Sequence, residues 1–167
     1  MKNNLQKHLE LYLIDKQQAH YRYVYGMVKQ EADTLDIIQD SIFKSLKKCH
    51  QLKDIDHLNA WFYRILTTTT YDFLRKHKRD GILVPDVEDI QVKTSMDTYE
   101  DIDLKTALSS LTVKEQAALR FRYYEDMKFE EVALILNENI STVKTRIYSA
   151  LKKLRTLMNQ DFEEEEQ

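Results

Sequence analysis

The sequence predicts an all-α protein made of two small helical domains joined by a flexible acidic linker. Only two Gly and one Pro occur among 167 residues, which leaves few residues for the frequent turns of a sheet. Apolar residues recur at spacings of three and four along most of the chain, as they do on amphipathic helices. This periodicity breaks in one acidic stretch, which separates the two domains.

Charge is distributed unevenly and gives the domain boundaries. We assign residues 1–80 and 105–160 to the two helical domains because each has an excess of Lys and Arg. Residues 81–104 form the acidic linker, and residues 161–167 form an acidic tail. The net charge of −3 therefore conceals two basic blocks, a modest electrostatic signature of nucleic-acid binding. The alternative is that these charge runs form ordinary solvated surfaces.

The first domain is expected to contain four helices, at about residues 5–15, 18–29, 32–49 and 58–77. A stripe at helical spacing on the third helix is expected to face the core. Its members are Leu35, Ile38, Ile42, Leu46 and Cys49. The fourth helix includes four consecutive threonines, which are poor helix formers, so tertiary packing must hold that turn.

A dense basic cluster, RKHKR at residues 75–79, ends the fourth helix. Such a cluster either complements the helix dipole or contacts phosphates, and the neighbouring aromatic residues favour phosphates. Trp61 in the same helix has two interpretations. It stacks on DNA, or it is a core residue, and burial is the commoner state.

The second domain begins with a capping-box pattern and ends with a helix-turn-helix. Thr112 and Glu115 form T-x-x-E, which starts a helix that runs to about Tyr124. A helix and a tight polar turn follow at residues 129–139, before a second, basic helix that runs to about Asn159. This layout is typical of DNA readers, although an ordinary helical hairpin has the same periodicity.

One face of this last helix has the chemistry of a major-groove reader. Its apolar side, which includes Ile140, Val143 and Ile147, is expected to be buried. The opposite face offers short hydroxyls and long cations, which suit base edges and phosphates. Its members are Ser141, Thr142, Lys144, Thr145, Arg146, Tyr148, Ser149 and Lys152.

The composition argues against membrane, secreted and enzymatic classes. No apolar stretch is long enough to span a bilayer, and the N-terminal residues lack a signal-peptide core. The single cysteine, Cys49, fits a reducing cytoplasm, and we expect it to be buried. His50 and His57 lack metal-ligand spacing, and no nucleophile–base pair or phosphate loop is recognisable. We therefore expect no catalysis, metal site or cofactor.

The two blocks together resemble an extracytoplasmic-function (ECF) sigma factor of the sigma-70 family, over about residues 18–80 and 105–157. A D-x-x-Q-D/E core at Asp36, Gln39 and Asp40 resembles the family's polymerase-binding segment. The helix AWFYRILTTTTYDFLRKHKR resembles its promoter-melting helix, with matches at Trp61, Arg64, Ile65, Asp72 and Arg75. LTVKEQAALRFRYYEDMKFEEVA followed by STVKTRIYSALKKLR resembles the segment that reads the minus-thirty-five element.

The resemblance implies a cytoplasmic specificity subunit that binds core RNA polymerase and directs promoter-specific initiation, in an envelope or stress response. It implies three partners, namely the β′ clamp helices and β flap of core polymerase, promoter DNA, and an anti-sigma factor that is often membrane-anchored. It implies no small-molecule substrate. The expected polymerase contacts are Asp36, Gln39, Asp40 and Phe43.

Two DNA-binding surfaces are also implied by the resemblance. The loop at residues 53–59 would receive a base flipped out of the minus-ten element, which must be unstacked first. The expected minus-ten residues are His57, Leu58, Asn59, Trp61, Arg64, Thr68, Arg75, Lys76 and Arg79. The expected minus-thirty-five residues are Ser141, Thr142, Lys144, Thr145, Arg146, Tyr148 and Ser149.

Some positions depart from the family pattern. Thr68 stands where Asn is usual, and Lys128 stands where a Ser-like helix cap is common. In the helix-turn-helix turn, Asn137 and Glu138 replace a Gly and an apolar residue. Asn137 tolerates the left-handed conformation that the turn needs, and Ile140 is expected to supply the missing apolar anchor.

The alternative function is a stand-alone helix-turn-helix regulator that binds an operator as a dimer. The first domain would then serve for sensing or dimerisation. A purified initiation assay separates the two functions, because only a sigma factor makes core polymerase initiate at a defined promoter.

Overall fold

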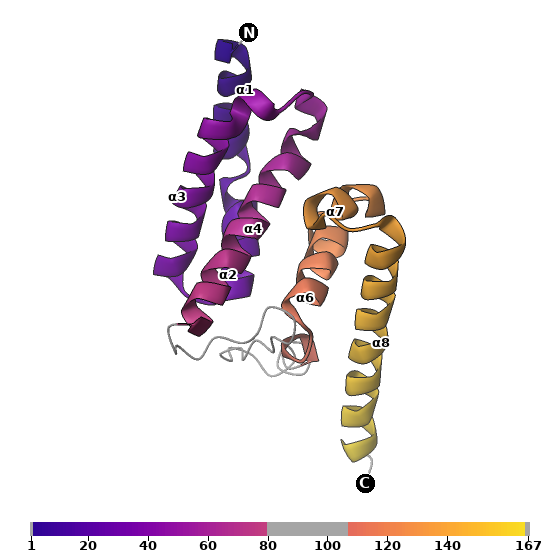
Figure 1. Cartoon of the computed structure of the whole chain (residues 1–167). Coiled ribbons are helices and arrows are strands. Elements are labelled where there is room, and N and C mark those ends of the chain that lie inside the picture. Colours follow the sequence, from indigo (N-terminus) through magenta and orange to yellow (C-terminus); the bar gives the residue numbers. More distant parts are fainter. Residues whose placement is uncertain (1, 80–106, 166–167) are drawn as a thin grey trace. The chain divides into compact units, whose positions relative to one another are not determined.

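The computed structural model describes the backbone of residues 2–79 and 107–165, and the predicted linker at 81–104 lies outside them. Every regular element in these ranges is helical (Figure 1), which confirms the predicted all-α class. The helices are α1 (Lys2–Asp15), α2 (Gln17–Val28), α3 (Glu31–Lys48), α4 (Leu58–Arg79), α6 (Val113–Leu119), α7 (Phe129–Leu136) and α8 (Ile140–Glu165). The shorter helical turns are η1 (Cys49–Gln51), η2 (Ile55–His57) and η3 (Arg120–Tyr124).

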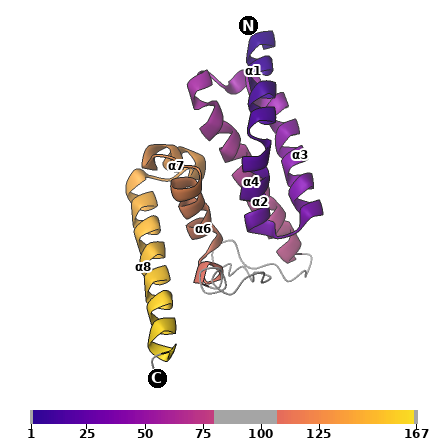
Figure 2. The same ribbon diagram turned by 180° about the vertical axis from the view of Figure 1, so that it is seen from behind.

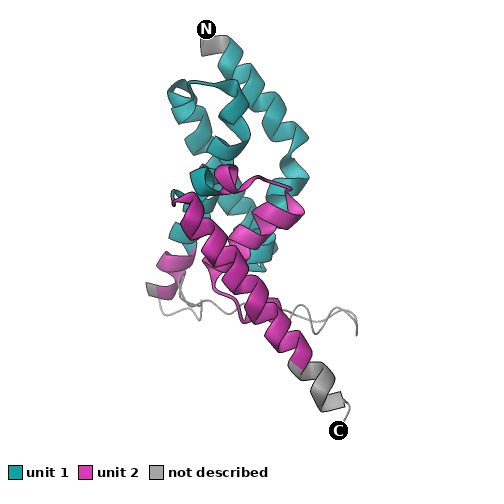
Figure 3. Ribbon diagram, turned by 90° about the vertical axis from the view of Figure 1, so that its right-hand side faces the viewer, with its two compact units in different colours: residues 1–73, 133–137 teal, residues 74–132, 138–167 magenta. Residues whose placement is uncertain are grey.

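The chain divides into two compact units (Figure 3). One comprises residues 1–73 with 133–137, and the other comprises residues 74–132 with 138–167. Helices α1, α2, α3 and most of α4 thus belong to the first unit, and α6, η3 and α8 belong to the second. We describe helices α1–α4 and helices α6–α8 as separate sets.

The first four helices enclose a core that is rich in aromatic rings. Helices α1, α2 and α3 contact one another, and the two opposite views show them alongside α4 (Figures 1 and 2). Phe62 and Tyr63 of α4 are at most 1% exposed. The rings of Tyr23 and Tyr63 meet edge to face with centroids 5.6 Å apart, an arrangement that aromatic pairs prefer.

The buried face of α3 is not the apolar stripe that we predicted. Leu35 and Leu46 are 46% and 36% exposed, and Ile38, Ile42 and Cys49 are only partly buried. The residues of α3 that face the core are Thr34, Ile37, Ser41 and Ser45. The prediction was wrong because it ranked side chains by hydrophobicity alone.

Hydroxyl side chains can face this core because they satisfy their own hydrogen bonds. Thr34 Oγ1 donates to the Gln30 carbonyl at 2.6 Å, and Ser41 Oγ donates to the Ile37 carbonyl at 2.7 Å. A buried hydroxyl that is bonded in this way leaves no unsatisfied donor. Small side chains also allow a close approach of neighbouring helices, and α3 contacts α2 extensively.

The four consecutive threonines of α4 are held in a similar way, as the sequence required. The hydroxyl groups of Tyr23 and Thr67 share a buried hydrogen bond of 2.8 Å. Thr70 Oγ1 donates to the Leu66 carbonyl at 2.7 Å. Thr68 differs from its neighbours because its side chain is exposed.

The capping box predicted at the start of the second domain is present. The Thr112 hydroxyl accepts the Glu115 N–H at 3.2 Å, and the Glu115 carboxylate accepts the Thr112 N–H at 3.3 Å. The same carboxylate accepts a 2.7 Å hydrogen bond from Lys153 Nζ, which ties α6 to α8. Helix α6 continues as the wider turn η3 to Tyr124, the end that we predicted.

Helix α8 buries the middle of the apolar face that we predicted for it, whereas Leu151 and Leu154 further along are only partly buried. Val143, Ile147 and Ala150 are fully buried, whereas Ile140 is 40% exposed and is not the predicted anchor. Ile140 is the first residue of α8, so it precedes the part of the helix that packs. The helix also runs past residue 159 to Glu165, since no Pro or Gly interrupts it.

Candidate functional site

The predicted polymerase-binding residues form one exposed face of α3. Asp36, Gln39, Asp40 and Phe43 recur at helical spacing and are all exposed. Asp40 forms an ion pair of 2.9 Å with Lys44. Phe43 is 57% exposed, with Lys47 Nζ 4.6 Å from its ring centroid. Exposed aromatic rings such as that of Phe43 are enriched at protein contact surfaces, and the two carboxylates beside it have the character of a polar rim.

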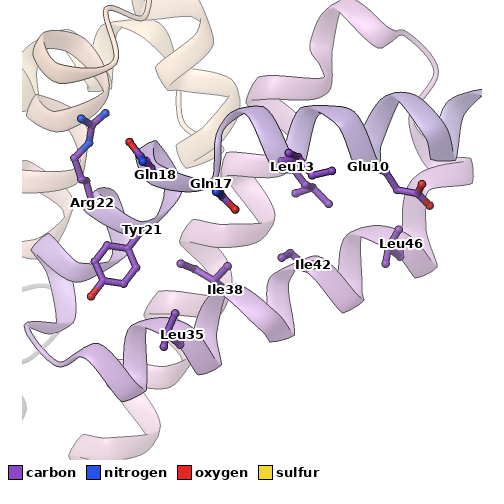
Figure 4. A pocket seen from close by; sticks show the side chains of 11 residues that line it. Glu10, Leu13, Gln17, Gln18, Tyr21, Arg22, Leu35, Ile38, Ile42 and Leu46 are labelled. Carbon is purple, nitrogen blue, oxygen red and sulfur yellow. The ribbon is translucent and has the colours of Figure 1, made fainter.

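An apolar groove of about 770 Å³ lies beside this face, between α1, α2 and α3 (Figure 4). The stripe of α3 forms one wall, and Leu13, Tyr21 and their neighbours on α1 and α2 form the other. The lining residues are Glu10, Leu13, Ile14, Gln17, Gln18, Tyr21, Arg22, Leu35, Ile38, Ile42 and Leu46. The sequence interpretation missed this groove because it placed the stripe in the core.

The predicted minus-ten residues separate into two groups. His57, Trp61, Arg64, Thr68 and Arg75 follow one another at spacings of three, four and seven, so they share one side of η2 and α4. Arg64, Thr68 and Arg75 are exposed, and Trp61 is partly buried, so it is not a core residue. Lys76 is also exposed, whereas the side chain of Arg79 lies outside the described residues.

A pocket opens at the η2 end of this exposed stripe. Lys53, Asp54, His57, Trp61 and Arg64 contribute to its lining. His57 Nδ1 lies 3.3 Å from the Asp54 carboxylate. An indole, an imidazole and a guanidinium around one opening can stack on a base and hydrogen-bond to its edges.

Leu58 and Asn59 do not line the pocket, although both are predicted minus-ten residues. Leu58 is 6% exposed and belongs to the core. The Asn59 side-chain oxygen Oδ1 accepts a 2.7 Å hydrogen bond from the Tyr12 hydroxyl, which lies 3.1 Å from His20 Nε2. The structure thus assigns Asn59 to a network that ties α1 and α2 to the start of α4.

His20 is the least exposed polar group of this network, at 1%. Its ring lies 4.6 Å from Phe62 and 5.1 Å from Tyr63, centroid to centroid. Burial, with a smaller contribution from Lys16, lowers the pKa of His20 from 6.5 to about 4. The imidazole is therefore neutral at pH 7 and acts as a hydrogen-bond partner.

The predicted recognition face of α8 is exposed except at one position. Ser141, Thr142, Lys144, Thr145, Tyr148 and Ser149 are all exposed. Arg146 is instead held by Glu138, with Nη2 at 2.7 Å and Nε at 3.3 Å from the two carboxylate oxygens. The left-handed backbone predicted for Asn137 is confirmed by its φ of 54°.

A cluster of cations and rings at the start of α7 was not predicted. Arg122 and Lys144 lie 4.8 and 5.4 Å from the Phe129 ring centroid, and Tyr148 packs against the same ring. Helix α7 lacks a Ser-like cap, but the Glu131 carboxylate accepts the Lys128 N–H at 3.0 Å. Arg122 could have been identified as a cation that lies just before the helix-turn-helix. It was missed because the DNA-binding residues of the second domain were sought only in the last helix.

Within the described ranges, no group of His, Cys, Asp or Glu residues is arranged to hold a metal ion. No helix in the same part of the chain is long and apolar enough to cross a membrane.

Comparison with protein families gives two matches that together cover most of the chain. The model for sigma-70 region 2 matches residues 13–80. The model for sigma-70 region 4 matches residues 101–154. The first range contains the exposed face of α3 and the stripe on α4, and the second contains the helix-turn-helix.

Curated relatives have similar lengths. RNA polymerase sigma factor SigV of Bacillus subtilis is 38% identical over 149 residues, which cover 89% of this chain and 90% of that protein. ECF RNA polymerase sigma factor SigM of the same species is 21% identical over 150 residues, covering 87% and 91%.

Two solved structures have a similar fold. The sigma factor RpoE in complex with the anti-sigma factor NepR from Bartonella quintana gives a TM-score of 0.71 at 22% identity, covering 90% of this chain and 96% of that one. CnrH in complex with the cytosolic domain of CnrY gives a TM-score of 0.66 at 18% identity, covering 92% and 88%.

Proposed function

Because the chain belongs to the sigma-70 family of RNA polymerase sigma factors, we propose that it recruits core polymerase through α3 and reads two promoter elements through α4 and α8. The observation that carries this proposal is the exposed face of Asp36, Gln39 and Asp40 beside an open apolar groove. A stand-alone regulator would use the same surface for dimerisation, so transcription initiation is the property that separates the two functions.

Reconstituted run-off transcription tests the proposal. The full-length protein with purified core polymerase should initiate at defined sites on genomic DNA, and core polymerase alone should not. Tight binding to duplex operator without polymerase, together with no initiation, would show that the regulator is the correct class. The same assay identifies the promoter, which supplies the DNA for the experiments below.

Docking to polymerase would use both the face and the groove of α3. An apolar helix of the partner can lie along Leu35, Ile38 and Ile42, while its basic residues pair with Asp36 and Asp40. This arrangement gives an apolar centre with a charged rim, as stable protein interfaces have. We assign the partner helix to the β′ clamp of polymerase.

Asp40→Lys should weaken core-polymerase binding by about tenfold or more, because it reverses one charge of the rim. Its ion pair with Lys44 is exposed, so the fold should lose less than about 1 kcal/mol. Asp15→Lys on α1 is the matched control, since that carboxylate is 75% exposed and lies outside the groove. Fluorescence titration with core enzyme measures both variants. Wild-type affinity of Asp40→Lys would remove this face from the interface.

Promoter opening would use the pocket and the stripe on α4. A base extracted from the minus-ten element must regain stacking and edge hydrogen bonds, which Trp61, His57 and Arg64 can offer. Arg75 and Lys76 would hold the adjacent phosphates, each contributing to the salt dependence of binding. This assignment makes His57, Trp61 and Arg64 the base-contacting residues in place of Leu58 and Asn59.

Upstream recognition would use the exposed face of α8 together with Arg122. Lys144→Ala should lower initiation several-fold on a promoter that carries the upstream element, because one groove contact is lost. On a template that lacks this element, the variant should match the wild type. An equal loss on both templates would place Lys144 outside upstream recognition.

We assign the protein to the cytoplasm, as a specificity subunit without catalysis of its own that serves an envelope or stress response. An anti-sigma factor is the proposed regulator, since two proteins of similar fold were solved in complex with one or with a partner's cytosolic domain. Co-purification of the tagged chain from its native cells tests this partner directly.

A further inference from the structure

The turn of the helix-turn-helix contains an ion pair that joins Glu138 to Arg146. Both guanidinium contacts are to the carboxylate, at 2.7 Å from Nη2 and 3.3 Å from Nε. The two side chains are only 19% and 21% exposed. A bidentate pair with this much burial is more strongly held than a surface ion pair.

Backbone geometry places the carboxylate for this contact. Asn137 ends α7 in the left-handed conformation, with φ of 54°, so the chain reverses immediately before Glu138. Arg146 lies on the second turn of α8, eight residues further along. The pair therefore fastens the turn to the body of the recognition helix.

The pair also changes which cations are available to DNA. An arginine reads guanine or grips a phosphate by offering two parallel N–H groups of its fork. Glu138 already occupies the Nε–Nη2 edge of Arg146, which leaves only the Nη1 end of the fork and offsets the positive charge that would attract a phosphate. Lys144, two residues earlier, is exposed and has no carboxylate partner among the described residues.

We propose that Glu138 is a positioning residue that clasps Arg146, fixes the turn, and keeps this arginine from contacting DNA. The proposal rests on the proposed function, since it concerns how the same face reads the upstream element. In this arrangement Lys144 and the hydroxyl residues read the groove, and Arg146 sets their position. The Glu138 carboxylate also prevents Arg146 from binding phosphates, a contact that would raise the affinity for DNA of any sequence.

Three variants of the full-length protein test the clasp: Glu138→Gln, Arg146→Gln and the double variant. Each is assembled into holoenzyme, and its affinity is measured for a promoter with the upstream element and for one with that element scrambled. Salt dependence is recorded for both. Glu130→Gln on α7 is the control, because it removes the same charge from an exposed position.

Each single variant should lower the preference for the intact element by about fivefold, and the double variant should be no worse than either single variant. Arg146→Gln should leave the slope of log affinity against log salt unchanged. Glu138→Gln should steepen it by about 0.9, since the released arginine reaches one phosphate. Glu130→Gln should retain wild-type preference.

A shallower slope for Arg146→Gln, with a larger loss than for Glu138→Gln, would overturn the proposal by showing that Arg146 contacts DNA itself. Additive losses in the double variant would overturn it too. If Arg146→Gln unfolds, Arg146→Lys replaces it, because lysine keeps the charge and loses the fork. It should then lose preference for the intact element as Glu138→Gln does but keep the wild-type salt slope, since Glu138 still offsets the ammonium charge. Wild-type holoenzyme that fails to initiate would reject the proposed function, whereas active wild type with unaffected variants would reject only the clasp.

Discussion

Helices α3 and α8 carry similar apolar stripes, yet they use them in opposite ways. On α8 the stripe of Val143, Ile147 and Ala150 is fully buried, and the polar face is exposed. On α3 the stripe of Leu35 and Leu46 is exposed, and hydroxyl residues face the core. Helix α8 thus leaves mainly its polar face exposed, whereas α3 leaves much of its apolar stripe exposed as well.

The difference reflects what the two sets of helices bury. Among the described residues, the buried polar side chains of α6–α8 are Glu115 and Gln116, while those of α1–α4 are His20, Thr34, Ser41, Ser45, Thr67, Thr69 and Thr70. Hydroxyls that bond to their own helix lose little on burial. An apolar stripe therefore identifies the buried face of a helix only where the side chains of the opposite face cannot make their hydrogen bonds within the same helix.

The largest expected effect is a difference in stability between two isoleucine-to-alanine variants, one in the stripe of α8 and one in the stripe of α3. Ile147→Ala should lower the free energy of unfolding by about 2–5 kcal/mol, because it leaves a cavity in a closed core. Ile42→Ala should cost less than about 1 kcal/mol, because its side chain is already partly solvated. Urea denaturation of both variants measures the contrast. Equal losses would mean that the groove of α3 closes in solution.

An effect of about 3 kcal/mol is expected from His20. Its pKa falls from 6.5 to about 4 on folding, so between these values the unfolded chain binds more protons than the folded one. Stability is therefore full above pH 6.5 and declines as the pH falls toward 4. His20→Gln should abolish this part of the decline in pH-dependent urea titrations. A variant as acid-sensitive as the wild type would show that carboxylates cause the decline instead.

A smaller effect is expected at the hydroxyl face of α3. Ser41→Leu should destabilise the fold by about 1–3 kcal/mol, because the added carbons have no space between closely packed helices. Ser41→Ala should stay within about 1 kcal/mol of the wild type, since it removes a bond that the hydroxyl makes to its own helix. Thermal unfolding compares the two. A stabilising leucine would mean that this face is loosely packed.

Sequence patterns were sufficient for the elements that local rules control. The capping box at Thr112, the left-handed Asn137 and a helix followed by a tight turn within residues 129–139 were all predicted from short-range chemistry. The all-α class followed from the scarcity of turn residues, and the family match confirms the predicted sigma factor class.

The features that were not predicted depend on contacts between distant residues. The groove beside α3 is open because Thr34 and Ser41 can face the core, where their hydroxyls bond to nearby backbone carbonyls. Hydrophobic periodicity does not take such hydrogen bonds into account. Asn59 is withdrawn from the pocket by Tyr12, 47 residues earlier. The pairing of Arg146 with Glu138 likewise requires the turn geometry before it can be recognised.

The hydrogen bond between Tyr12 and Asn59 has a consequence for synthesis. Translation at roughly 5–20 residues per second separates the two residues, which are 47 positions apart, by several seconds. Until α4 leaves the ribosome, His20 has neither Phe62 nor Tyr63 against it, so the burial that lowers its pKa is incomplete. The helices that are made first thus complete their aromatic core last, after Phe62 and Tyr63 of α4 have been made.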